Sequence, residues 1–189
     1  MATATKPDRL FFTADDEANR LLADEPLALL IGFALDQQVP LQKAFSSPLE
    51  LQRRIGPLDA ARIAGMDPGE LDDAFREKPA LHRFPGAMAQ RVQELCSVVS
   101  HEYGGRAEHI WTEATDGKDL RRRIGELPGF GDMKVRALGS VLAYRFGLET
   151  AKELAPDHAC LGEVDSPEAL ADYQAKKRAY KASLRAAAR

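Results

Sequence analysis

Apolar residues recur along this chain at intervals of three and four positions, the spacing that puts them on one face of a helix. The run PLALLIGFALDQQ shows this clearly, since one face carries Leu27, Leu30, Ile31, Ala34 and Leu35. A second run, PGAMAQRVQELCSVVSHEY, repeats the spacing with Met88, Val92, Leu95 and Val99. No stretch of four or more residues has the alternation of a strand. The pattern predicts an all-α protein.

Helix-start signals divide the rest of the chain. An acceptor side chain three residues ahead of an acid satisfies free amides at a helix start. This arrangement occurs at Thr13–Asp16, Ser47–Glu50 and Asp67–Glu70. Pro48 and Pro68 then fall at first helical positions, where a missing N–H costs little. Ser166 opens a last helix, SPEALADYQAKKRAYKASLRAAAR.

The composition favours a single folded domain whose charges are unevenly spread. A chain of 189 residues with 44% hydrophobic residues can bury a sizeable core. The net charge of −3 argues against DNA binding driven by overall charge. However, acids dominate the front of the chain, whereas residues 173–189 carry positive charges only. A basic surface on an acidic protein is therefore expected, or a solvated charged helix face.

Cysteine use and hydropathy bear on the compartment. Cys96 and Cys160 are the only cysteines, too few for a four-ligand zinc or iron–sulfur site and no sign of a disulfide framework. No run of eighteen apolar residues and no secretory signal is visible in the sequence. We therefore expect a cytoplasmic protein with no membrane segment.

The stretch LPGFGDMK, residues 127–134, separates two runs that read as helices. Gly129 and Gly131 flank Phe130, and glycine lets a backbone approach a ligand closely. The first turn of the following helix presents unpaired N–H groups, which favour an anion. A tight turn between two helices with no ligand is the alternative.

This stretch resembles the helix-hairpin-helix element of the HhH-GPD superfamily of base-excision DNA glycosylases, which reads L-P-G-[VI]-G followed by polar residues. The resemblance runs from about Pro26 to Leu148. Within the superfamily, the chain is most similar to the cluster-free branch, in particular to the bacterial HhH-GPD-type base excision repair proteins. It implies an all-α glycosylase-like fold with two helical lobes around a cleft. It also implies that hairpin amides hold a DNA phosphate, commonly with a monovalent cation. No iron–sulfur cluster or other required cofactor is expected.

Two weaker likenesses accompany the hairpin. Gln37-Gln38-Val39-Pro40 is similar to the Q-Q-[VL]-S sequence of alkylpurine-type glycosylases, whose following residues fill the duplex gap when a base is flipped out. The alternative is that Gln37 and Gln38 only cap their helix. Arg91 stands where a basic residue is common in these enzymes.

The chain departs from the family at its nucleophile. Strand-cleaving members have a lysine seventh in the hairpin motif, where its amine attacks the sugar. Here the seventh residue is Met133 and the eighth is Lys134, about 100° further round the helix. The resemblance therefore implies a monofunctional enzyme that activates water instead. Lys134, Met133 and Arg123 would still contact DNA.

The family's aspartate, which stabilises positive charge on the sugar or orients the nucleophile, is not at its usual spacing. The corresponding window, residues 151–153, reads AKE. Asp157 in LAPDHACL and Asp165 in GEVDSPEAL are the nearest candidates. Each has an ordinary alternative, Asp157 as a turn residue and Asp165 as a residue before a helix cap. A chain with no catalytic aspartate is the third alternative.

Three functional hypotheses follow. The first is a DNA N-glycosylase that removes a damaged base from double-stranded DNA, in the cytoplasm and associated with the nucleoid. The second is a non-catalytic helix-hairpin-helix DNA-binding protein, and the third a helical interaction protein with no nucleic-acid role. We expect a single domain over residues 1–189, with a central lobe at about 26–125, the hairpin at 124–147, and the N- and C-terminal helices forming the second lobe. The lesion and the oligomeric state have no signal in the sequence.

Overall fold

The computed structural model describes residues 6–187, and all regular structure in that range is helical, as the apolar spacing predicts. The helices in chain order are α1 (Asp16–Asp24), α2 (Pro26–Leu35), α3 (Leu41–Ile55), α4 (Ala60–Ala64), α5 (Pro68–Arg76), α6 (Pro85–Glu102), α7 (His109–Thr112), α8 (Gly117–Gly125), α9 (Asp132–Tyr144), the 3-10 segments η1 (Glu149–Leu154) and η2 (Leu161–Glu163), and α10 (Pro167–Ala187).

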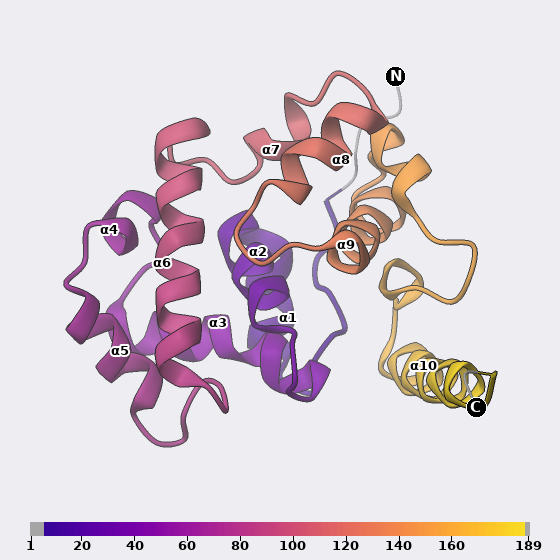
Figure 1. Cartoon of the computed structure of the whole chain (residues 1–189), viewed down its shortest axis with the longest axis horizontal. Coiled ribbons are helices and arrows are strands. Elements are labelled where there is room, and N and C mark those ends of the chain that lie inside the picture. The colour runs from indigo at the N-terminus through magenta and orange to yellow at the C-terminus, as the bar shows by residue number, and fades with distance from the viewer. Residues whose placement is uncertain (1–5, 188–189) are drawn as a thin grey trace.

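Helix α2 is the centre of the molecule (Figure 1). Every residue from Leu27 to Leu35 is buried, so this helix has no solvent face. Helices α1, α3 and α6 pack around it, and α4 and α5 cover the far side of α6. On the opposite side α9 packs against η1 and η2, and α8 packs against η1 and α9. The two sides place the end of α2 beside the start of α9, which is where the candidate site lies.

Close contact between α2 and α3 depends on a small residue. The Phe45 ring packs edge-on against Phe33 at 5.0 Å and against Phe12 at 5.1 Å. A Cβ added to Gly32 would lie 2.6 Å from Cδ1 of Phe45, closer than real atoms approach. The glycine therefore lets this aromatic cluster fill the core at normal packing density.

Two of the helix starts have the caps that their sequence signals suggest, with one shift of position. Asp67 caps α5 by accepting from the amides of Gly69 and Glu70, as predicted. At α1 the cap is Asp15, whose side chain accepts from the amides of Glu17 and Ala18, and not the expected Thr13. The signal therefore located this helix but not the residue that caps it.

The helix start predicted at Ser47 is wrong. Helix α3 begins at Leu41 and passes through Pro48. Ser47 is buried, and its hydroxyl hydrogen-bonds to the carbonyls of Lys43 and Leu81 instead of capping a helix. Ser47 and Pro48 therefore lie inside a longer helix and do not mark a helix start.

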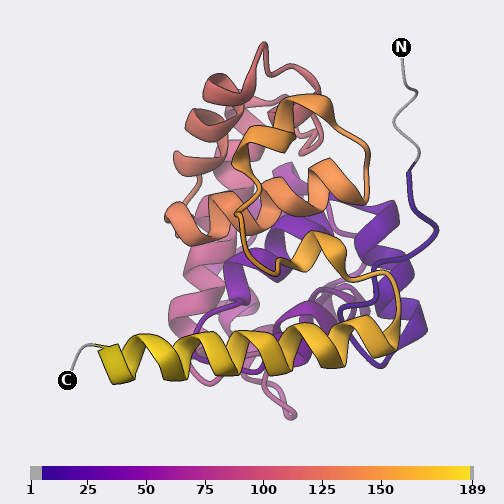
Figure 2. The same cartoon turned by 90° about the vertical axis from the view of Figure 1, so that its right-hand side faces the viewer.

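Helix α10 stands apart from the body. It begins at Pro167, where the Ser166 hydroxyl accepts from the amide of Ala169, as predicted for this helix start. It packs against η2 and buries Leu170, and from Arg178 onward every described residue is exposed. In Figure 2 the helix runs along one edge of the molecule and extends past the other helices.

None of the described helices has the length and apolar character needed to cross a membrane. Cys96 and Cys160 are both buried, and both are free thiols. Helix α1 packs on α2 and α3, whereas α10 packs on η2. The division of the chain into two lobes stays a prediction.

Candidate functional site

The turn between α8 and α9 is held by two apolar anchors and one left-handed residue. Leu127 and Phe130 are buried, Phe130 with 5% of its surface exposed. Their amides donate to Ile124 O at 3.2 Å and to Leu127 O at 3.1 Å. Gly129 has φ +81°, a conformation that costs other residues about 1–2 kcal/mol. The buried Phe130 side chain therefore fixes the turn, and only the backbone of the turn is available to a ligand.

The outer side of this turn carries free backbone donors. Within residues 6–187, the amides of Gly129, Gly131, Asp132 and Met133 donate to no protein acceptor. All four residues are exposed, and the last three form the start of α9. Unpaired N–H groups at a helix start carry partial positive charge and attract anions. We call these four residues the amide turn.

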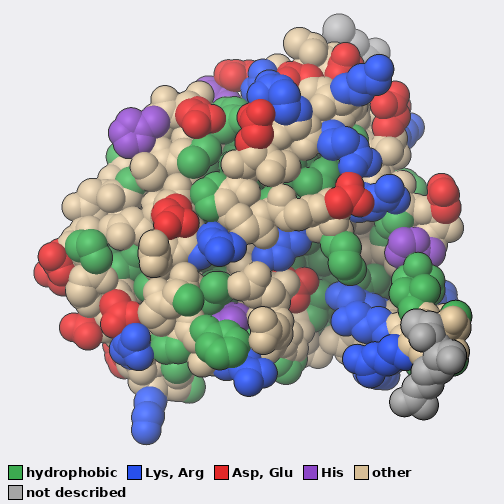
Figure 3. Space-filling view, in the orientation of Figure 1, with side chains coloured by type: hydrophobic (Ala, Val, Ile, Leu, Met, Phe, Trp, Pro, Cys, Tyr) green, Lys and Arg blue, Asp and Glu red, His purple; other side chains and the backbone are tan. Residues whose placement is uncertain are grey.

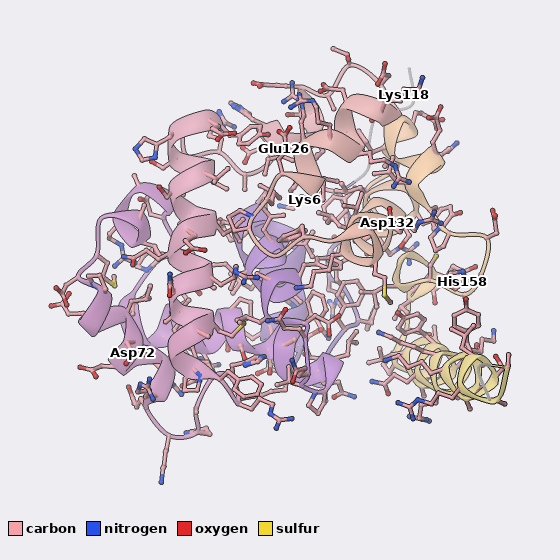
Figure 4. All side chains as sticks on the ribbon, viewed as in Figure 1. Lys6, Asp72, Lys118, Glu126, Asp132 and His158 are labelled. Carbon is pink, nitrogen blue, oxygen red and sulfur yellow. The ribbon has the colours of Figure 1, made fainter. Side chains whose placement is uncertain are left out.

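The amide turn contains one acid, Asp132, whose negative charge is balanced by two arginines. Asp132 accepts from Arg121 Nη1 at 2.6 Å and from Arg136 Nε at 2.9 Å. The hydrogen bond from Arg121, and that from Arg136, hold the pKa of Asp132 below its ordinary value. Figure 4 labels this side chain at the start of α9. One carboxylate with two guanidinium groups leaves a net positive charge, so the turn does not repel an anion.

The two arginines expected to contact DNA differ in their surroundings. Arg123 donates to Asp119 at 2.9 Å and lies over the Tyr103 ring at 6.0 Å, so its guanidinium is already engaged. Arg91 of α6 lies against the amide turn, because any side chain at Gly129 would collide with its guanidinium. The fold thus brings Arg91 to the turn, and its DNA contact stays a prediction.

Lys134 and Met133 point in different directions. Met133 is 76% exposed. Lys134 is partly buried, with Nζ donating to Ala34 O at 3.1 Å and lying 5.7 Å from the centre of the Phe130 ring. Burial lowers the pKa of Lys134, the Arg91 charge lowers it further, and the Asp36 charge opposes both. The eighth residue of the motif is therefore the one that joins α9 to the end of α2.

The fold brings the acid Asp36 close to Lys134. It follows directly on α2 and is partly buried. Burial raises the pKa of Asp36, against the opposing charges of Lys177, Lys134 and Lys181. Asp36 was not among the candidates predicted from the sequence. A signal was present, since Asp36 is the acid that ends a long apolar run just before Gln37-Gln38.

Gln37 and Gln38 follow Asp36 in an irregular link to α3. Helix α2 ends through backbone bonds, Asp36 N to Phe33 O and Gln37 N to Leu35 O, and neither glutamine side chain caps it. Gln37 Nε2 donates to Met88 Sδ at 3.4 Å. Gln38 is exposed and has φ +56°, a conformation uncommon outside glycine. Backbone strain of this kind often accompanies functional positions.

His82 is buried and holds the Gln37 backbone through a hydrogen bond. It is 2% exposed, its Nε2 donates to Gln37 O at 2.9 Å, and its Nδ1 accepts from the amide of Phe84 at 3.0 Å. Protonation of Nδ1 would turn this acceptor into a donor facing another donor. Burial also disfavours the charged ring, so the pKa of His82 lies below its ordinary value of 6.5.

A pH effect on stability follows from His82. The unfolded chain takes up a proton at His82 below about pH 6.5, whereas the folded chain resists it, so stability is lost as the pH falls below that value. Urea unfolding between about pH 7 and pH 5 should show this fall, and a His82→Gln variant should lack it. His101, which is exposed, supplies the control: His101→Gln should keep the fall. An equal fall in the His82→Gln variant would contradict the assignment.

The two aspartates named from the sequence lie elsewhere on the surface. Asp157 and Asp165 are exposed, and neither side chain makes a hydrogen bond or ion pair within residues 6–187. Asp157 precedes His158, whose ring stacks on Tyr180 of α10 at 5.2 Å, and Figure 4 labels His158 beside that helix. The charges that act on the Lys134 amine are Asp36 and Arg91, not Asp157 or Asp165.

No family model, curated protein or solved structure matches the chain. The geometry of its own residues is therefore what supports a function. The fold places the amide turn, Arg91, Lys134, Asp36 and the Gln37-Gln38 link in one region between α2, α6 and α9.

Proposed function

We propose that this protein binds double-stranded DNA through the amide turn and removes a damaged base by hydrolysis of its N-glycosidic bond, without cleaving the strand. The observation that carries the proposal is a turn with four free amides followed by Lys134, whose charge interacts with the partly buried carboxylate of Asp36. The resemblance of LPGFG to the hairpin of base-excision glycosylases supports the same function.

The amide turn would hold one phosphate. The space beside Gly131 is open, since a Cβ added there would have no protein atom within 4 Å. A phosphate oxygen can therefore approach the main-chain N–H groups closely. The carbonyls of Pro128 and Gly129 accept no hydrogen bond within residues 6–187, which leaves them free to bind the monovalent cation that the resemblance implies. Such a cation would add positive charge beside the phosphate.

Asp36 is a better candidate than Asp157 or Asp165 for the activation of water. A general base needs a position at the reacting atoms and a pKa nearer to neutral than that of a free carboxyl group. Burial raises the pKa of Asp36 in that direction, and the neighbouring Lys134 amine can stabilise its ionised form. In the proposed step, water attacks the sugar carbon, the base leaves with the electron pair of the broken bond, and Asp36 takes a proton from the attacking water. A base that leaves as an anion then takes up a proton from solvent.

Gln38 is the better placed of the two glutamines to fill the gap left by a flipped base. Its side chain is exposed and makes no hydrogen bond within residues 6–187. Gln37 is held by its carbonyl to His82 and by its side chain to Met88.

A non-catalytic DNA-binding protein is the alternative. The missing aspartate favours it, since residues 151–153 read AKE, and Asp157 and Asp165 are exposed. This protein would keep the amide turn and grip DNA without excising a base.

Incubation with duplexes that contain uracil, alkylated bases or oxidised bases separates these functions. We expect abasic sites, revealed by alkali, in at least one duplex, and intact strands when alkali is omitted. Binding without abasic sites across the panel would favour the alternative. No binding to any duplex at low salt would overturn both.

A further inference from the structure

Helix α10 carries a surplus of positive charge that the protein does not neutralise. From Tyr173 to the end of the described helix it has basic side chains and no acid. Lys176 pairs with Asp172 at 2.7 Å. Within residues 6–187 the remaining basic side chains of this segment make no ion pair, namely Lys177, Arg178, Lys181 and Arg185.

These charges stand on a helix that the fold supports at one end. Leu170 is buried and Tyr173 is half-buried against the core, and burial raises the pKa of Tyr173 to about 12. Beyond that point the large apolar side chains of α10, Tyr180 and Leu184, are exposed, and Tyr180 stacks on His158. From Arg178 onward every described residue of α10 is exposed, so the basic side chains of this part of the helix are open to a ligand.

Part of this charge faces the candidate site. Tyr173, Lys177, Lys181 and Arg185 follow at intervals of four, which places them in one row along the helix, roughly 6 Å apart. Lys177 Nζ lies 5.6 Å from the centre of the Tyr173 ring. Figure 3 shows a hollow between α10 and the rest of the molecule, with Lys and Arg side chains gathered on its α10 side.

The same hollow is bordered by the start of α9. The basic groups whose charges act on Asp36 are Lys134 of α9 and Lys177 and Lys181 of α10, so both helices bring positive charge near this one carboxylate. The amide turn is the N-terminal end of α9. A polyanion held at the turn would therefore lie within reach of the α10 row.

We propose that α10 is the second wall of a nucleic-acid channel, with Lys177, Lys181 and Arg185 binding the sugar-phosphate backbone of the duplex that the amide turn holds. This rests on the proposed function. Unpaired cations in a row match the regular charge of a phosphate backbone, and each contact releases counterions. The helix adds affinity that does not depend on sequence, whereas Asp36 and Gln38 act on the damaged nucleotide.

The test is the salt dependence of duplex binding, measured by fluorescence anisotropy with an undamaged labelled duplex. Each phosphate contact contributes about −0.9 to the slope of log affinity against log salt. A Lys177→Gln/Lys181→Gln variant should therefore have a slope shallower by about 1.8 than that of the wild type. The Lys176→Gln variant is the matched control on the same helix, since Lys176 pairs with Asp172, and it should keep the wild-type slope.

The outcomes separate this inference from the proposed function. If the wild type binds and the double variant keeps its slope, α10 is not a DNA wall and the proposed function stands. An equal loss in the Lys176→Gln variant would also overturn the inference, because it would indicate a general effect of charge. If the wild type does not bind duplex at all, both fail. Circular dichroism of each variant confirms that α10 remains helical.

Discussion

An Asp36→Asn variant should lose base excision by about 10²- to 10⁴-fold, the range that a positioned general base contributes, and should keep its affinity for duplex DNA. Asparagine has nearly the same shape but cannot take a proton from water. The amide turn is formed by other residues, so DNA binding should survive. Single-turnover excision on the most reactive duplex of the lesion panel measures the loss.

Asp157→Asn and Asp165→Asn are the matched controls for Asp36. Both side chains are exposed and make no hydrogen bond within residues 6–187, so both variants should excise at the wild-type rate. Loss of activity in either one, with an active Asp36→Asn variant, would return the catalytic role to an aspartate predicted from the sequence.

The pH profile gives a second readout of the same role. Asp36 accepts a proton only when it is ionised, so the excision rate should rise with pH through its pKa. Because burial raises that pKa, the acid side of the profile should lie above the ordinary aspartate value of 3.8. A profile that falls only near the ordinary value would argue against a buried base.

The elements that the sequence predicted well are those whose signals are local. Apolar spacing identified α2 and α6, and Asp67 and Ser166 marked the starts of α5 and α10. The turn at LPGFG followed from its glycines and flanking helical runs. Of the two glycines, only Gly129 needs its conformational freedom, since Gly131 has φ −83° and ψ 178°.

The parts that the sequence did not predict depend on contacts between distant residues. The bond from Lys134 to Ala34 joins positions one hundred residues apart, and no local pattern shows that the chain returns there. Asp36 acquires its raised pKa from this packing, not from its neighbours in sequence. Arg123 is an exception, because it pairs with Asp119 four residues earlier on the same helix, a local spacing that the sequence already shows. Local chemistry thus predicted the turn, while tertiary packing decided which charges surround it.

Deletion of a single backbone amide should weaken DNA binding strongly. Gly131 has a backbone conformation close to that of proline, so Gly131→Pro removes one N–H from the amide turn with little change in its path. A hydrogen bond to a charged group contributes about 1.5–3 kcal/mol, which corresponds to a loss of roughly 10- to 100-fold in affinity. Anisotropy titration with a labelled duplex at fixed salt measures this loss.

Gly131→Ala is the matched control, because it keeps the N–H and adds only a methyl group. That methyl group would have no protein atom within 4 Å, and residue 131 has an ordinary φ, so the variant should fold. If the phosphate sits on the amides, it should bind DNA within a few-fold of the wild type. Equal affinity of the proline and alanine variants, with unchanged thermal stability, would mean that the amide at position 131 does not hold DNA. Since that amide opens α9, such a result would move the DNA contact from the turn to the basic side chains of Arg91 and α10.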